Sequence, residues 1–490
     1  MGTDGIAAYP TPVRRMVAGG VRVFLAESLL IPTGLLTAAY LARRLGPEGY
    51  GIFMVAAALV AWIEWSLTAV FSRASVRFVA EAADWRPIGS TLVSAQLALA
   101  AAAAALLWIL AEPIAGLLGI PRLAGPLRLF ALDIPPFCLA QAHRNILIGI
   151  GSFSQRALAA AARWTSRLLL VVFLVELGLS IEGAVLGSIG ASLVELAVCR
   201  RYVKPAFSAR ATLQVGRLWG YVAPLLLSAL ALRLYDRLDL VALTALGGGP
   251  ERAGHYGAAQ NLAILPSLLA LAFTPLLLAT LTRSFRDGAR AEAHRIGRGA
   301  LRAVLLLVPF AGLGAAAAPE IVGLIFGPAF APAAPLIPPL LFAAVALVLV
   351  AVTTAILIAV GRPGLTVACT APLPVLAAAA YIAVIPVHGA RGAAFVTLAG
   401  AVLVASSLVA AVYRVCRILP PAASAARSGA VCAGAYALAS LWSTSGALVL
   451  VELGVVAAGI VLALVAAGEF TRGELAMVRA WRSPAAAPAP

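Results

Sequence analysis

The sequence predicts an all-α membrane protein with about fourteen transmembrane helices, built as two parallel six-helix lobes plus an extra helix pair. Three observations lead there. Of the 490 residues, 62% are hydrophobic and only 11% are charged, with a mean hydropathy of +1.00. Apolar stretches of roughly 20 residues, enough to cross a bilayer, recur from end to end. Short sequence patterns also repeat in the same order in the two halves of the chain.

The apolar stretches define the spans in order. The first follows Arg14 and Arg15 and is about 24 residues long, too long for a signal-peptide core, so we expect it to stay as a first span. The fourteen spans are expected near residues 19–42, 51–71, 91–111, 128–149, 158–178, 181–199, 219–246, 256–281, 300–317, 337–360, 364–386, 390–413, 429–445 and 447–467.

The positive charges on the connecting loops predict the orientation. One set of alternate loops, together with both termini, holds 23 Lys and Arg residues. The other set holds five, namely Arg43, Arg44, Arg122, Arg252 and Arg391. Because positive loops stay in the cytoplasm, both termini are expected to be cytoplasmic and the number of spans even. The net charge of +16 fits this rule better than it fits nucleic-acid binding.

An internal repeat predicts the two lobes. "LGPEGYGIFMVAAAL" from Leu45 matches "GGGPERAGHYGAAQNL" from Gly247, "AEPIAGLLG" matches "APEIVGLIFG", and "ILIGIG" matches "ILIAVG". Shared Ala and Leu content alone would not align the turn residues. We expect an N-terminal lobe over residues 1–210, a C-terminal lobe over 211–420, an additional pair of spans over 421–470 and a disordered cytoplasmic tail over 471–490.

The repeated Gly-Pro-Glu is interpreted as a tight extracytoplasmic turn between helices. Tyr50 and Tyr256, which follow the two turns, are expected at the membrane interface, where tyrosine is enriched.

Familiar catalytic chemistry is missing from the sequence. Lys204 is the only lysine and follows no glycine-rich loop, which excludes ATP hydrolysis through a Walker A motif. The four histidines and five cysteines show no zinc-binding spacing. The connecting loops are too short for a soluble catalytic domain. We therefore expect no enzyme activity, no cofactor and no metal site.

Charged residues inside the spans are the candidate functional residues, because each costs about 2.5–3.5 kcal/mol at the bilayer centre. The stretch "LALRLYDRLDLVALTAL" places Arg233, Asp236, Arg237 and Asp239 within an arc of about 160 degrees on one helix. The group could line a cavity between the lobes, or it could form a self-paired polar knot between helices.

Further charges lie in the first half. Arg163 and Arg167 share one face of the fifth span, and Glu27, Glu64, Asp133 and Glu195 could carry a proton or pair with an arginine. The predicted substrate-binding residues of a central cavity are Arg22, Arg144, Arg163, Arg167, Arg233 and Arg237. The predicted ion-coupling or counter-ion residues are Glu27, Asp236 and Asp239.

Several short patterns together resemble a known family. They are "ARRLGPEGYGIF", "SRASVRFVAE", "ILIGIGSFSQRAL" and "DRLDLVAL" followed by "GHYGAAQNL". The chain resembles bacterial polysaccharide repeat-unit flippases, which belong to the multidrug/oligosaccharidyl-lipid/polysaccharide (MOP) superfamily together with lipid II flippases and multidrug extruders of the MATE type.

The resemblance implies a multi-pass protein of the bacterial inner membrane that flips an undecaprenyl-diphosphate-linked oligosaccharide by alternating access. An ion gradient or the membrane potential would drive it, with H⁺ or Na⁺ as coupling cation, and its partners would be membrane lipids and a polysaccharide polymerase or glycosyltransferases. Two other transporter functions stay open, a multidrug or metabolite cation antiporter and a lipid II flippase. A membrane glycan polymerase or ligase is the remaining alternative, which the absence of a long extracytoplasmic loop disfavours.

Overall fold

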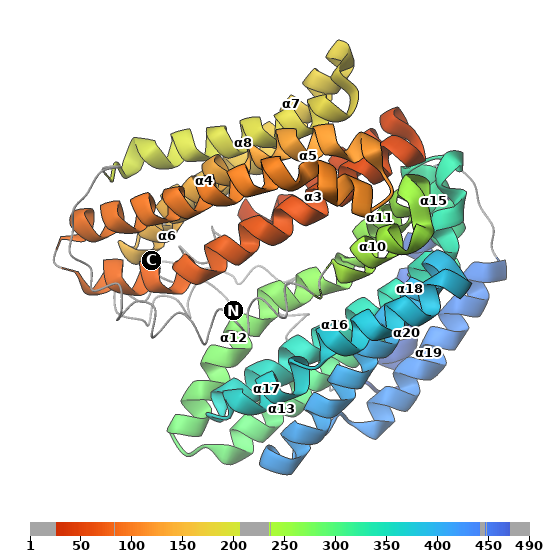
Figure 1. The fold of residues 1–490 in the computed structure, drawn as a ribbon. Helices are drawn as coiled ribbons and strands as arrows, with labels where there is room; N and C mark the ends of the chain where they lie inside the picture. Colours follow the sequence, from red (N-terminus) through yellow and green to blue (C-terminus); the bar gives the residue numbers. More distant parts are fainter. Residues whose placement is uncertain are drawn as a thin grey trace, which may run out of the picture.

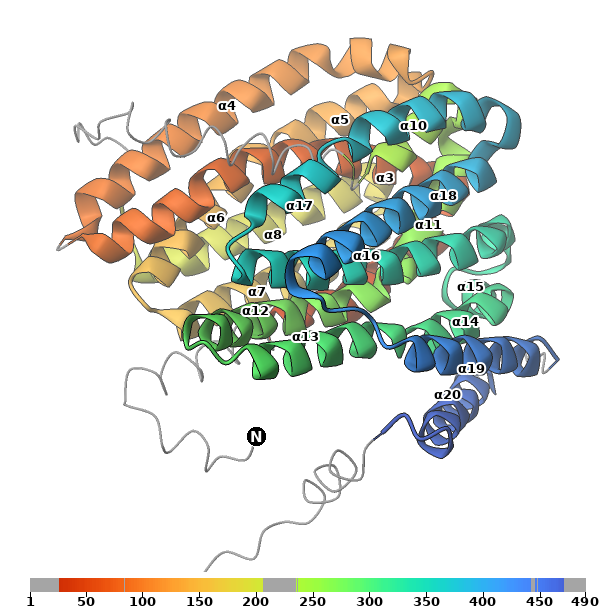
Figure 2. The same ribbon diagram turned by 90° about the horizontal axis from the view of Figure 1, so that it is seen from below.

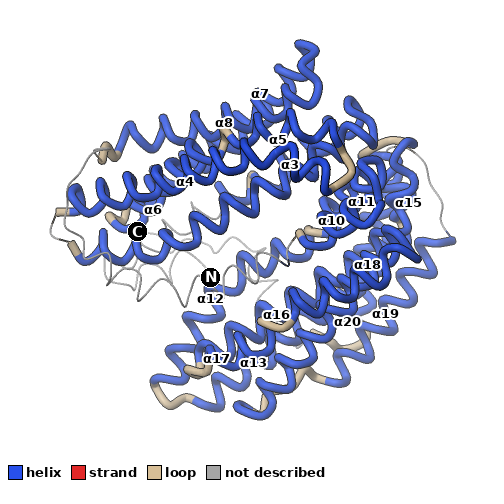
Figure 3. Tube along the Cα trace, in the orientation of Figure 1, coloured by secondary structure: helices blue, strands red, loops and turns tan. Residues whose placement is uncertain are grey.

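A computed structural model describes residues 26–82, 84–205, 235, 237–441, 446 and 448–470. Within these ranges the regular structure is entirely helical (Figure 3). Eight helical segments of the described part are long and apolar enough to cross a membrane, and some of them contain two of the predicted spans. The prediction of an all-α, multi-pass membrane protein is confirmed.

The helices of the first half account for spans one to six. They are α3 (Leu30–Glu81), α4 (Trp85–Leu117), η1 (Pro121–Leu123), α5 (Ala124–Ala131), α6 (Ile134–Gly149), α7 (Phe153–Leu174), the π-helical turn η2 (Val175–Leu179) and α8 (Ser180–Tyr202). Gly46, with φ 67°, divides α3 into two segments, which correspond to the first two predicted spans.

The second half and the extra pair follow in the same manner. Their helices are α10 (Leu238–Leu243), η3 (Thr244–Gly248), α11 (Gly249–Ala263), α12 (Leu265–Arg286), α13 (Arg290–Leu305), α14 (Val308–Ala316), α15 (Ala318–Ile325), η4 (Pro328–Leu336), α16 (Ile337–Ala359), α17 (Pro363–Thr370), α18 (Leu373–Cys416), α19 (Ala422–Leu441) and α20 (Leu448–Ala466). A break at Gly389 divides α18. Each predicted span thus has a helical counterpart, the seventh only in its last part.

The backbone reproduces the internal repeat. Gly46 (φ 67°, ψ 176°) and Gly249 (φ 68°, ψ 170°) have nearly the same conformation, and each precedes a proline. Only glycine adopts this conformation without strain. The turns after the matched "ILIGIG" and "ILIAVG" also close alike, because Ser152 N donates to Leu147 O at 2.8 Å and Arg362 N donates to Leu357 O at 2.9 Å. The repeat is therefore structural as well as compositional.

The described helices form two bundles that meet at one end (Figure 1). Helices α3 to α8 make the first bundle, and α12 to α18 with α19 and α20 make the second. The bundles are joined where α11 packs along α3, and they diverge from there. Figure 2 shows α19 and α20 at the edge of the second bundle, where α19 packs against α14.

The two repeated Gly-Pro-Glu turns contact each other at this junction. A Cβ atom added at Gly51 would lie 1.7 Å from the carbonyl oxygen of Pro250, and one added at Gly254 would lie 2.0 Å from that of Pro47. The glycines thus allow backbone contact between the halves. Arg43 adds hydrogen bonds from the first half to the last-turn carbonyls of α15, with Nε 2.9 Å from the oxygen of Ile325.

The tyrosines after these turns are buried inside the protein and do not face lipid head groups, so the prediction of interfacial side chains was wrong. Tyr50 and Tyr256 are fully buried. Tyr50 packs edge-on against Phe330, with ring centroids 5.7 Å apart, and accepts a hydrogen bond from Asn261 Nδ2 at 2.7 Å. Because the adjacent glycines bring α3 and α11 into backbone contact, the Tyr50 ring is enclosed against the second half, whereas the Tyr256 hydroxyl bonds to Asp239 within the second half.

Candidate functional site

A buried ion-pair network occupies the first half. Arg144 on α6 donates to Glu195 Oε1 at 2.9 Å and to Glu27 Oε1 at 2.6 Å, and Glu27 also pairs with Arg156 at 3.3 Å. Arg163 on α7 donates to the other oxygen of Glu195 at 3.0 Å. The Glu195 side chain is fully buried between the two arginines.

Packing fixes this network further. The guanidinium carbon of Arg163 lies 4.7 Å from the centre of the Phe137 ring, and its Nη1 donates to the Ser192 hydroxyl at 3.2 Å. Arg144 and Arg163 are therefore neutralised by carboxylates, and either could bind an anion only after an ion pair had broken.

Two other predicted arginines lie near the junction of the halves. Arg167 on α7 and Arg237, just before α10, are both half-buried and close enough to the Tyr50 hydroxyl to interact with it electrostatically. Arg167 makes no hydrogen bond or ion pair with the described residues, and Asp133 and Glu64 act on it only at longer range. Arg237 donates to Gln260 Oε1 at 3.1 Å. Each guanidinium group thus keeps most of its donors free of described partners.

Asp239 is the centre of a polar network in the second half. Its Oδ2 accepts hydrogen bonds from Tyr256 at 2.8 Å, Gln260 at 2.8 Å and Thr397 at 3.3 Å, and its Oδ1 accepts one from the backbone N–H of Leu240. The network joins α10, α11 and α18. Such convergent donors stabilise a carboxylate, and the surrounding oxygens are of the type that a hard cation prefers.

A second pair of acids lies buried in the first half. Among the described residues, Glu64 Oε1 and Asp133 Oδ1 have no hydrogen-bond partner, and neither amide atom of the buried Gln96 has one. Each is shielded from solvent, so an ionised carboxylate at either position would lack the hydrogen bonds that a buried charge requires.

Not all of the predicted residues can be placed. Arg22, Arg233 and Asp236 lie outside the described residues, so the predicted contact between Arg233 and Asp236 stays a prediction. Sequence reasoning missed Gln260, Thr397 and Tyr381, which surround Asp239 directly or through one another. The polar pair Gln260-Asn261 in the Ala-rich stretch "GAAQNL" was the signal that could have drawn attention to α11.

Comparison with known families now decides the family. The sequence model described as "Polysaccharide biosynthesis protein" matches residues 17–278, more than half of the chain. The chain belongs to this polysaccharide biosynthesis protein family. The match includes the first half, the Gly-Pro-Glu junction and the Asp239 network up to α11. No curated protein is similar enough in sequence to be matched.

Solved structures show where the fold of this polysaccharide biosynthesis protein recurs. The lipid II flippase MurJ in an inward closed conformation has a TM-score of 0.77 and 12% identity, covering 92% of this chain and 98% of MurJ. An inward-facing multidrug resistance MATE family transporter of the MOP superfamily has a TM-score of 0.58 and 14% identity, covering 80% and 94%. A point mutant of the Vibrio cholerae MATE transporter VcmN has a TM-score of 0.59 and 16% identity, covering 82% and 97%.

At these identities the likeness concerns the fold. The expected MOP-superfamily fold is confirmed, and all three matched proteins are described as flippases or transporters. The polysaccharide biosynthesis protein described here thus combines a fold similar to that of MurJ and the MATE transporters with two sets of arginines, one buried and ion-paired and the other half-buried.

Proposed function

We propose that the protein is a flippase that moves an undecaprenyl-diphosphate-linked oligosaccharide from the cytoplasmic to the outer leaflet of the bacterial inner membrane. Two findings support transport of a polysaccharide precursor: the matching family model is named for polysaccharide biosynthesis, and the fold is similar to that of a lipid flippase. Alternating access of the two bundles about the α3–α11 junction would carry the substrate across.

One observation carries the substrate proposal. Arg167 and Arg237 come from opposite halves, act on the same tyrosine through their charge and lack a carboxylate partner within ion-pair distance among the described residues. A diphosphate is a compact anion with several oxygens, and arginine binds such oxygens through two parallel hydrogen bonds. In a water-poor site these interactions are stronger than they are in bulk water.

The paired arginines would have a different role. Arg144 and Arg163 share Glu195 and hold α6, α7 and α8 together, so they act as a scaffold for Arg167, one helical turn beyond Arg163. In this proposal Arg167 and Arg237 bind the phosphate groups, and Glu27 is a counter-ion of the scaffold.

Asp239 is the proposed coupling residue. Its carboxylate links three helices of the second half, so protonation or binding of Na⁺ would change the hydrogen bonds between them. An ion gradient or the membrane potential could then bias the movement of the two bundles without ATP.

The experiment compares Arg167→Ala and Arg237→Ala with Arg128→Ala. Arg128 serves as the control, because it is ion-paired with Glu112 at 2.9 Å and has no proposed part in substrate binding. Surface polysaccharide is measured in cells at matched protein level. We expect a drop of roughly tenfold or more for each junction variant, from the loss of about 1.5–3 kcal/mol per charged hydrogen-bonding contact. Export at the control level in both junction variants would refute the proposal.

A lipid II flippase is the second candidate, because the matched MurJ structure covers 92% of the chain at a TM-score of 0.77. Flipping assays with the purified protein in liposomes separate the two candidates. Lipid II and a polysaccharide repeat unit on the same lipid are tested in turn, and the lipid that is flipped identifies the function. A cation antiporter is disfavoured by the unpaired guanidinium groups at the junction, which would repel an organic cation.

A further inference from the structure

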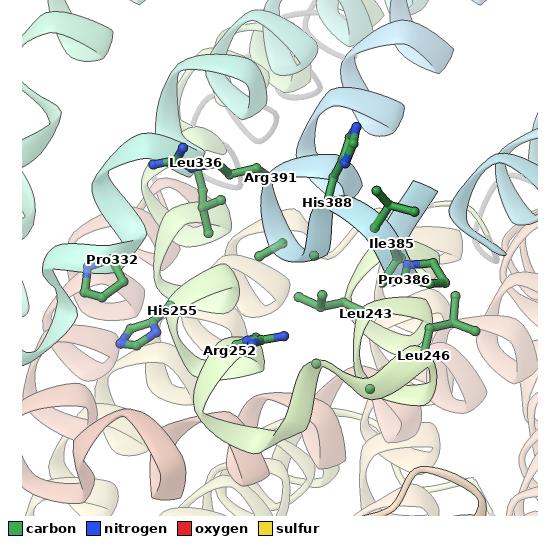
Figure 4. Close-up of a pocket in the computed structure, with 15 residues that line it drawn as sticks. Leu243, Leu246, Arg252, His255, Pro332, Leu336, Ile385, Pro386, His388 and Arg391 are labelled. Atoms are coloured by element: carbon green, nitrogen blue, oxygen red, sulfur yellow. The ribbon is translucent and has the colours of Figure 1, made fainter. Parts of the chain in front are cut away.

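A cavity of about 480 Å³ lies in the second half, at the end of the bundle that the loop charges predict to be extracytoplasmic. We call it the outer pocket. It opens to the surface on one side and is lined by the end of α10, η3, the start of α11, η4 and the turn of α18 around Gly389. Figure 4 shows Arg252 and His255 on the α11 side and His388 and Arg391 on the α18 turn.

The lining of the outer pocket is basic on one part and apolar on the other. Arg252, His255, His388 and Arg391 are its ionisable residues, and no carboxylate of the described part of the chain lines it. Leucine, isoleucine, valine and proline side chains make up most of the rest. His255 is held in place, since its Nε2 lies 3.1 Å from the carbonyl oxygen of Ala329 and its ring packs edge-on against Phe330.

The other arginines predicted on this side already have partners. Arg44 pairs with Glu176, Arg122 pairs with Glu48 at 2.9 Å, and Arg43 donates to backbone carbonyls of α15. Arg252 and Arg391, by contrast, make no hydrogen bond or ion pair with any described residue, and both line the outer pocket. The two unengaged arginines of this face are therefore gathered in one concavity.

The repeat shows that the fold does not require this charge. Ser180 (φ 50°, ψ −125°) in the first half occupies the same kind of turn as Gly389 (φ 56°, ψ −140°) in the second. The matched position two residues further on is Glu182 in the first half and Arg391 in the second. Because the same turn forms with either sign of charge, the turn itself does not require Arg391, which is free to serve another purpose.

We propose that the outer pocket binds the phosphate group of a lipid head group on the extracytoplasmic face. Each of the two guanidinium groups has two parallel N–H donors for phosphate oxygens. The apolar walls accept the start of a hydrocarbon chain or the face of a sugar. The volume exceeds that of a single phosphate and fits a diphosphate with an attached group. The identity of the lipid rests on the proposed function: if the protein is a flippase, the pocket receives the diphosphate of the flipped lipid.

The test uses the full-length protein in nanodiscs of phosphatidylcholine, with farnesyl diphosphate as the probe. The protein carries Arg167→Ala and Arg237→Ala, so that the proposed central site does not contribute. Binding is measured by calorimetry, and thermal unfolding confirms that each variant is folded.

We expect one equivalent of probe to bind this background. Adding Arg252→Ala with Arg391→Ala should weaken binding on the order of a hundredfold or more, from the loss of two charged contacts. Arg252→Lys with Arg391→Lys should keep part of the affinity, because lysine has the positive charge but not the two parallel N–H donors of arginine. Arg122→Ala, a matched arginine that is ion-paired outside the pocket, should leave binding unchanged.

The outcomes separate the pocket from the transport proposal. Equal affinity in the background and in the Arg252→Ala, Arg391→Ala protein, or no binding to the folded background, would overturn the outer pocket even if transport occurs. Loss of transport in other variants leaves this binding measurement intact. Adding phosphatidylglycerol to the nanodiscs then identifies the source: displacement of the probe supports a resident phospholipid head group, and its retention supports the polyprenyl diphosphate.

Discussion

The glycine contact between the two halves gives the sharpest structural prediction. Replacing Gly51 by alanine adds a methyl group 1.7 Å from the Pro250 carbonyl oxygen, about half the distance of an ordinary contact. The obstructing atom is backbone, so no side chain can rotate away. The α3 and α11 segments must separate, and such overpacking costs about 1–3 kcal/mol.

Thermal unfolding in detergent and surface polysaccharide export measure the consequence. Gly51→Ala and Gly254→Ala should both lower the Tm and reduce export, because each opens the same contact from one side. Gly116→Ala in α4 is the control, since an added Cβ there meets nothing within 4 Å. A Tm and an export level in both junction variants equal to those of the Gly116→Ala protein would contradict a close backbone contact at Gly51 and Gly254.

Three further predictions concern the buried charges. Glu195→Gln should lower the free energy of unfolding by about 3–5 kcal/mol, and with it the Tm, because it leaves Arg144 and Arg163 without their shared carboxylate. An unchanged melting curve would contradict this. Asp239→Asn should abolish the dependence of transport in liposomes on an imposed H⁺ or Na⁺ gradient, and a variant that still responds to the gradient would exclude Asp239 as the coupling residue. Burial alone would raise the pKa of Glu469, but hydrogen bonds from Ser424, Arg427 and Arg302 hold it below its ordinary value. The carboxylate therefore stabilises the docking of α19 and α20 at neutral pH and loses that effect as the pH falls below about 4. Melting curves of wild type and Glu469→Gln over a pH series test this. The wild type should have the higher Tm at neutral pH, and the two Tm values should converge in acid.

The helices were predictable because their information is local. A run of apolar residues has to cross the membrane as a helix wherever it packs, and a glycine before a proline marks a turn in either half. Gly46 and Gly249 could thus be matched from the sequence alone, and the structure gives them the same backbone conformation.

The partners of the buried charges were not predictable, because they depend on how helices rotate and pack. Arg163 and Arg167 share a helical face, yet one is bonded to Glu195 and the other has no described partner. The difference arises from α8, which lies beside Arg163 and contributes Glu195 and Ser192. Tyr50 illustrates the same limit, since its burial results from close contact with a helix about 200 residues later.

Arg43 has a consequence for the solvent at the junction. Its guanidinium group satisfies carbonyl oxygens in the last turn of α15, which belong to the opposite half. The last carbonyls of a helix have no partner within the helix, so any parting of the halves at this end would expose them unbonded. Arg43 is exposed, so water can replace these hydrogen bonds as the halves part, and the cost of breaking them at this end is lower than it would be for a buried contact.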